Sequence, residues 1–133
     1  MPFTRISLHA GKPPAYLAAI ADSLDRALVD CFEVPENDRF VAFDLRQPGE
    51  LIFDRHYRGG PRSDDYVLFQ IMTGRARASE TKARFFRRLA DNLAQAPGLR
   101  REDVMVIIVN SQFEDWSFAS GEQASTAPRE ARS

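Results

Sequence analysis

Pro2 has the most distinctive potential chemistry in the chain, because it directly follows the initiator Met1. The small side chain of Pro2 permits removal of Met1, which would leave a free secondary amine. An α-amino group has a reference pKa of roughly 7.7–8.0, so this amine could act as an acid or a base near neutral pH. It could also attack a carbonyl carbon to form an iminium ion. Many proteins begin with Met-Pro without any functional role for the proline, so Pro2 alone is weak evidence for catalysis.

Two arginines, Arg75 and Arg77, follow the third predicted strand in the segment TGRAR at 73–77. Residues two apart in an extended chain point to the same face, so both guanidinium groups could converge on one ligand. Such a pair suits bidentate capture of a carboxylate. The alternative is two solvated arginines ahead of a helix, and the spacing alone favours that alternative.

Asp38 and the aromatic pair Trp116 and Phe118 are the remaining candidates. Asp38 precedes the second predicted strand, where it could hold the Pro2 amine in its charged form or orient a water molecule. A turn residue that satisfies local backbone donors is the more common role at such a position. Trp116 and Phe118 could line an apolar substrate pocket, or they could equally close the edge of the core or a subunit contact.

Composition excludes several classes of function. The net charge is −1 and the sequence has no long basic stripe, so we expect no nucleic-acid partner. No apolar stretch approaches the roughly 20 residues of a membrane helix, and no signal peptide is evident. Cys31 is the single cysteine, which excludes an intrachain disulfide and fits a cytoplasmic protein. His9 and His56 lack the spacing of metal ligands, so we expect no metal site.

The elements that must position these residues are four strands and two helices. Apolar periodicity predicts strands at 3–8, 39–45, 66–73 and 104–109. The first helix begins at Pro13 and Pro14 and extends to Cys31, with acidic residues such as Asp22 and Asp25 largely off its buried face. Ser79 is expected to cap the second helix. The buried face of that helix is predicted to comprise Phe86, Leu89, Ala90 and Leu93.

The order strand–helix–strand occurs twice, which suggests a duplicated β-α-β unit in an α/β (α+β) fold. Each unit should pair its strands in parallel, with both helices on one face of a four-stranded mixed sheet. The chain has nothing left to cover the other face, so we expect an oligomer. We place a single domain at 2–121, including a loop at 54–65, and a flexible C-terminal tail at 122–133.

Taken together, these signals resemble the tautomerase superfamily, and within it the malonate semialdehyde decarboxylase group. The resemblance runs from Pro2 to about residue 121. It is carried by PFTRI at 2–6, VPENDRF at 34–40, GRAR at 74–77 leading into SETK at 79–82, and NS at 110–111 with DWSF at 115–118. The loop at 54–65 differs from the usual content of this group, which leaves the substrate open.

The resemblance implies a homotrimer with a cofactor-free active site around Pro2 and a small 2-oxo or 3-oxo carboxylate as substrate. Arg75 and Arg77 would bind and polarise that substrate, and Asp38 would assist Pro2 or a water molecule. Decarboxylation and keto–enol tautomerisation of phenylpyruvate-type 2-oxo acids both remain open. A non-enzymatic ferredoxin-like binding module is the alternative of another class, and it would have an antiparallel sheet.

Overall fold

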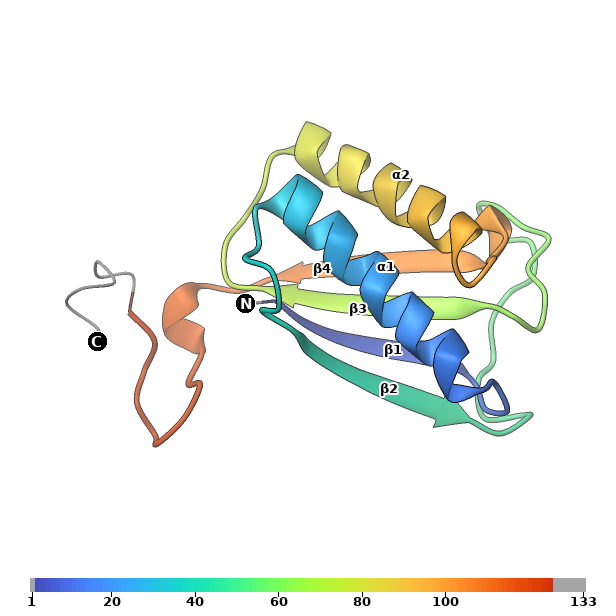
Figure 1. The fold of residues 1–133 in the computed structure, drawn as a ribbon, viewed down its shortest axis with the longest axis horizontal. Helices are drawn as coiled ribbons and strands as arrows, with labels where there is room; N and C mark the ends of the chain where they lie inside the picture. Colours follow the sequence, from blue (N-terminus) through green and yellow to red (C-terminus); the bar gives the residue numbers. More distant parts are fainter. Residues whose placement is uncertain (1, 126–133) are drawn as a thin grey trace.

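Two helices pack on one face of a four-stranded sheet, as the ribbon in Figure 1 shows. The structure is a computed structural model, and it describes residues 2–125. The strands are β1 (Phe3–His9), β2 (Phe40–Arg46), β3 (Val67–Thr73) and β4 (Val104–Asn110). The helices are α1 (Pro14–Phe32) and α2 (Ser79–Gln95), with short 3₁₀ turns η1 (Arg101–Asp103) and η2 (Phe113–Asp115) on either side of β4.

The sheet has the order β2-β1-β3-β4. β1 pairs in parallel with β2, and β3 pairs in parallel with β4, while the central β1–β3 pair is antiparallel. Two β-α-β units are thus joined edge to edge in one mixed sheet. This confirms the duplicated fold predicted from the sequence, and its parallel pairs exclude the antiparallel sheet expected of a ferredoxin-like module.

Both helices bury the face that looks onto the sheet. On α1, Ile20, Leu24 and Leu28 are buried, as the periodicity predicts. On α2 the buried residues are Phe85, Leu89 and Leu93, one on each successive turn.

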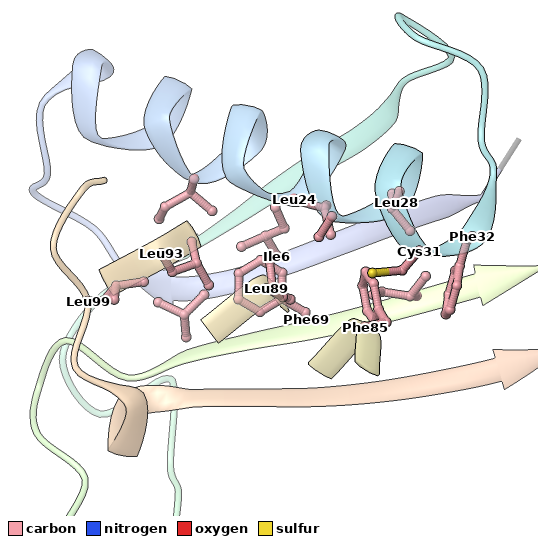
Figure 2. Packing of buried hydrophobic residues seen from close by; sticks show 14 of the residues in the cluster. Ile6, Leu24, Leu28, Cys31, Phe32, Phe69, Phe85, Leu89, Leu93 and Leu99 are labelled. Atoms are coloured by element: carbon pink, nitrogen blue, oxygen red, sulfur yellow. The ribbon is translucent and has the colours of Figure 1, made fainter. Parts of the chain in front are cut away.

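Two details of α2 were wrong in the sequence prediction. Phe86 was assigned to the buried face, but it is 40% exposed and its neighbour Phe85 is fully buried. Phe85 is the buried residue of the two because its ring stacks on that of Phe32 in α1, with the ring centroids 4.5 Å apart (Figure 2). Ser79 is the first helical residue, and Ala78 occupies the N-cap position without a side-chain hydrogen bond.

The core lies between the helices and the inner face of the sheet. Ile6 and Leu8 of β1 and Phe69 and Ile71 of β3 point into it and are at most 2% exposed. Figure 2 shows Ile6 and Phe69 meeting the apolar side chains of both helices. The two central strands thereby fix the position of residues that follow or precede them at the sheet end.

The opposite face of the sheet carries exposed apolar side chains. Met105, Ile107 and Val109 alternate along β4 and are 38%, 41% and 47% exposed, and Met72 of neighbouring β3 is 40% exposed. The apolar run at 104–109 is therefore half covered within one chain, by its parallel pairing with β3 and by the helices. The remaining half is an apolar surface that we call the open face.

The end of the chain is described only in part. Of the tail predicted at 122–133, residues 126–133 lie outside the described residues. Ala124 donates a backbone hydrogen bond to Trp116 at 2.8 Å, so this part of the segment folds back along the residues that precede it. Within residues 2–125, neither helix combines the length and apolar character that crossing a membrane requires.

Candidate active site

Strand register gathers the candidate residues at one end of the sheet. Phe3 of β1 pairs with Phe40 of β2 in parallel and with Met72 of β3 in the antiparallel sense. The start of β1, the start of β2 and the end of β3 therefore meet. β4 runs parallel to β3 and ends beside it, so the segment after β4 leaves from the same place. This is the end marked N in Figure 1.

Pro2 is buried and lines a small cleft between α1 and the β1–β2 edge. Asp38 and Arg39 line the same cleft from the α1–β2 connection, and Asp25 lines it from α1. The cleft has a volume of about 10 Å³, which is about the space that one water molecule needs. Pro2 and Asp38 therefore line the same small cleft.

Arg39 forms the ionic link between this cleft and α1. Its Nη1 donates to Asp22 at 2.7 Å and its Nη2 to Asp25 at 3.2 Å. The hydrogen bond to Asp22, assisted by the charge of Asp25, raises the pKa of Arg39. The two carboxylates differ in setting, because the Asp22 side chain is 60% exposed and that of Asp25 only 11%.

Asp25 was not recognised as a site residue in the sequence. The acidic residues of α1 were expected to lie largely off its buried face, but Asp25 is buried beside Leu24 and Leu28. A carboxylate flanked by buried apolar residues on a helix is the signal that could have found it, since such a group needs a charged partner. That partner, Arg39, is distant in sequence.

The two arginines after β3 lie in different settings. Arg77 is half-buried: its Nη1 donates to the Arg75 carbonyl oxygen at 3.0 Å and its Nη2 to the Phe32 carbonyl oxygen at 3.3 Å. Its Cζ lies 4.5 Å from the centre of the Phe32 ring. Burial lowers the pKa of Arg77, and the charge of Arg75 lowers it further. The two cations are therefore close enough to interact, although Arg77 also anchors its own loop to α1.

Arg75 is exposed and lines an open groove of about 550 Å³. Gly74 lines the same groove from the β3–α2 connection, and Ser111, Phe113 and Asp115 line it from the segment after β4. The groove therefore lies between Arg75 and the segment that precedes Trp116 and Phe118, and neither of these two aromatic residues lines it.

A chain of hydrogen bonds ties that aromatic segment to the end of β3. The Trp116 Nε1 donates to Ser111 Oγ at 2.7 Å, and Ser111 Oγ donates to the Thr73 carbonyl oxygen at 2.7 Å. Trp116 stacks on Phe118 with centroids 5.6 Å apart. Phe118 in turn contacts Phe40, which lines the cleft beside Pro2, with centroids 6.4 Å apart. The aromatic side chains therefore reach from the Arg75 groove toward the Pro2 cleft.

In the described part of the chain, no three His, Cys, Asp or Glu side chains form a cluster that could hold a metal ion. His9 Nδ1 lies 3.1 Å from the Asp64 carbonyl oxygen at the opposite end of β1 from Pro2. His56 is exposed in the loop at 54–65.

Comparison with known proteins gives consistent matches. A family model described as a tautomerase enzyme matches residues 38–119. Two probable tautomerases of Bacillus subtilis (strain 168), YusQ and YrdN, are 28% and 30% identical over 121 and 122 residues. The alignments cover 91% and 92% of this chain, and 95% and 94% of the relatives.

Among solved structures, malonate semialdehyde decarboxylase matches with a TM-score of 0.84 at 32% identity, over 90% of this chain and 92% of that one. The FG41 malonate semialdehyde decarboxylase inhibited by 3-bromopropiolate matches with a TM-score of 0.83, also at 32% identity, over 90% of this chain and 91% of that one. A fused 4-OT symmetric trimer shares the fold, with a TM-score of 0.76 at 20% identity, over 96% of this chain and 99% of that one.

Proposed function

Because the chain belongs to the tautomerase family, we propose that it is a cofactor-free enzyme that uses Pro2 on a small 2-oxo or 3-oxo carboxylate. The reaction that we favour is the decarboxylation of malonate semialdehyde, because the chain is 32% identical to malonate semialdehyde decarboxylase over 90% of its length. The observation that carries the proposal is the shared cleft of Pro2 and Asp38, placed at the sheet end from which Arg75 and Arg77 follow β3.

In the decarboxylation of a 3-oxo acid, the bond between the carboxylate carbon and C2 breaks and CO₂ leaves. The electron pair of that bond passes into the C3 carbonyl and forms an enolate. Protonated Pro2 stabilises the negative charge on the enolate oxygen. C2 then takes a proton from the Pro2 ammonium or from water, and the carbonyl group forms again. Arg75 and Arg77 hold the carboxylate and the carbonyl in place.

Keto–enol tautomerisation is the second candidate, favoured by the two Bacillus relatives named probable tautomerases. Here the neutral Pro2 nitrogen removes a proton from carbon and returns it to oxygen, so the protonation state of Pro2 decides between the two reactions. Asp38 bears on that choice, because a nearby carboxylate favours the charged amine.

A homotrimer in the cytoplasm is part of the same proposal. The open face is apolar and uncovered in one chain, with Ile107 and Val109 41% and 47% exposed, and a second and third copy would cover it. Light scattering should give a mass of three chains of 15.1 kDa each. Ile107→Glu should dissociate the assembly, whereas Ile52→Glu, at a side chain 89% exposed outside the sheet, should not.

Turnover assays test the reaction directly. We expect the pure protein to release CO₂ from malonate semialdehyde, and Arg75→Ala to lose at least about 100-fold in kcat/KM because the substrate carboxylate loses its partner. Arg87→Ala is the matched control, an exposed arginine on α2. Enolisation of phenylpyruvate without CO₂ release would select the second candidate. If the protein showed neither CO₂ release nor enolisation at any pH from 5 to 9, that result would contradict the proposal.

A further inference from the structure

Charged side chains of both signs line the cleft beside Pro2. Asp25 and Asp38 contribute two negative charges to the lining of the cleft, and Arg39 contributes one positive charge. Arg75 and Arg77 follow β3 at the same end of the sheet, and neither lines this cleft. Of the two carboxylates, that of Asp25 is the more deeply buried, with its side chain 11% exposed.

Thr4 supplies an independent observation inside the same cleft. Its side chain is 1% exposed and lines the same cleft as Pro2. The Thr4 hydroxyl has no hydrogen-bond partner within residues 2–125. A buried hydroxyl is rarely left unpaired in a native protein, and the volume of about 10 Å³ matches one water molecule.

We propose that Asp25 is a positioning residue for Pro2: across a cleft in which the Thr4 hydroxyl holds one water molecule, its carboxylate keeps the Pro2 nitrogen protonated. This role rests on the proposed function. It also makes that function more specific, because a protonated Pro2 can stabilise the enolate formed by decarboxylation but cannot abstract a proton. Asp25 comes from α1, whereas Asp38 comes from the α1–β2 connection, so the two carboxylates line the cleft from two elements.

Burial makes the Asp25 charge effective. The side chain is 11% exposed, so its field is weakly screened by solvent. Arg39 offsets part of that field, but only its Nη2 binds Asp25, because its Nη1 binds the exposed Asp22. The carboxylate of Asp25 therefore acts on Pro2 more strongly than that of Asp22, although both bind the same guanidinium.

The test compares Asp25→Asn with Asp22→Asn, a matched pair because each removes one carboxylate partner of Arg39. In protein labelled with ¹⁵N at Pro2 and verified by mass to lack Met1, the nitrogen is titrated by NMR without substrate. We expect Asp25→Asn to raise the acid dissociation constant of Pro2 at least about threefold, and Asp22→Asn to change it by less than about 1.5-fold. Equal shifts, or no shift in Asp25→Asn, would overturn the proposal.

Thr4→Val is the second variant, which keeps the shape of the side chain and removes only the hydroxyl. A crystal structure of the wild type should show an ordered water within hydrogen-bonding distance of Thr4 Oγ1, and Thr4→Val should lack it. Its Pro2 titration should move in the same direction as that of Asp25→Asn, since loss of the water disfavours the charged amine. A wild-type Thr4 hydroxyl bonded only to protein atoms would contradict the water site.

Titration and turnover separate this inference from the proposed function. An inactive wild type whose Pro2 still responds to Asp25→Asn contradicts the proposed function alone. An active wild type whose Pro2 is indifferent to Asp25→Asn contradicts the role of Asp25 alone. Thermal unfolding of both variants verifies that each is folded before its titration is compared.

Discussion

The guanidinium of Arg77 lies over the ring of Phe32, with Cζ 4.5 Å from the ring centre and Nη2 bonded to the Phe32 carbonyl oxygen at 3.3 Å. This contact joins the connection after β3 to the last residue of α1. It also supplies a donor to one of the carbonyl groups that the end of a helix leaves unpaired. Arg77 therefore holds its loop in place, in addition to any part that it has in binding substrate.

Arg77→Lys should cost stability as well as activity. Lysine keeps the charge but loses the planar stacking and the forked hydrogen bonds to Phe32 and Arg75, so we expect a loss on the order of 1–2 kcal/mol in the free energy of unfolding. Urea denaturation measures this loss. Arg75→Lys is the matched change at an exposed arginine and should alter stability by less than about 0.5 kcal/mol. A more destabilising effect at Arg75 than at Arg77 would contradict the assignment.

Phe85→Ala should destabilise the chain far more than Phe86→Ala. Phe85 is fully buried against Phe32, so its truncation should cost about 3–5 kcal/mol, whereas Phe86 is 40% exposed and should cost less than about 1.5 kcal/mol. Thermal or urea unfolding of the two variants gives the comparison. The reverse order would restore the assignment drawn from the sequence.

These two residues show where sequence periodicity succeeds and where it stops. Alternation and helical spacing predict all four strands and both helices, because a two-layer fold this small must bury one face of each. Periodicity cannot separate Phe85 from Phe86, since both lie near the same face and the stacking on Phe32 decides. Nor can it find the pairing of Asp25 with Arg39, which depends on how α1 packs beside β2. Pro2, Asp38 and Arg75 were singled out by residue type and by the resemblance to a family, and the strand register places them at one end of the sheet.

Gly60→Ala should disrupt the loop at 54–65. Gly60 has φ +97° and an added Cβ would overlap the Arg55 carbonyl oxygen, so we expect a loss of about 1–3 kcal/mol in unfolding free energy. Gly49→Ala is the control, because Gly49 also has a positive φ, +89°, but has open space around it. Its loss should be the smaller of the two when both are measured by urea denaturation, and equal losses would show that backbone strain alone decides.

Asp54 should make the stability of the same loop depend on pH. Backbone hydrogen bonds from His56 and Tyr57 lower the pKa of Asp54 below its reference value of 3.8. A carboxyl with a depressed pKa in the folded state stabilises the fold above its unfolded pKa, and this stabilisation is lost as the pH falls through the folded pKa. Wild type should therefore be more stable than Asp54→Asn at pH 6, and the difference should shrink below about pH 4. A difference that stays constant down to pH 2 would contradict this.

The central claim is that a free Pro2 nitrogen carries the chemistry. The most direct measurement is the kcat/KM for CO₂ release from malonate semialdehyde by two forms of the chain, each verified by intact mass. One form is the mature chain that begins at Pro2, and the other has a lysine inserted between Met1 and Pro2, so that Met1 stays and the ring nitrogen remains in a peptide bond. We predict that the first form is active and that the second loses at least about 1,000-fold. Comparable turnover by both forms would contradict the account.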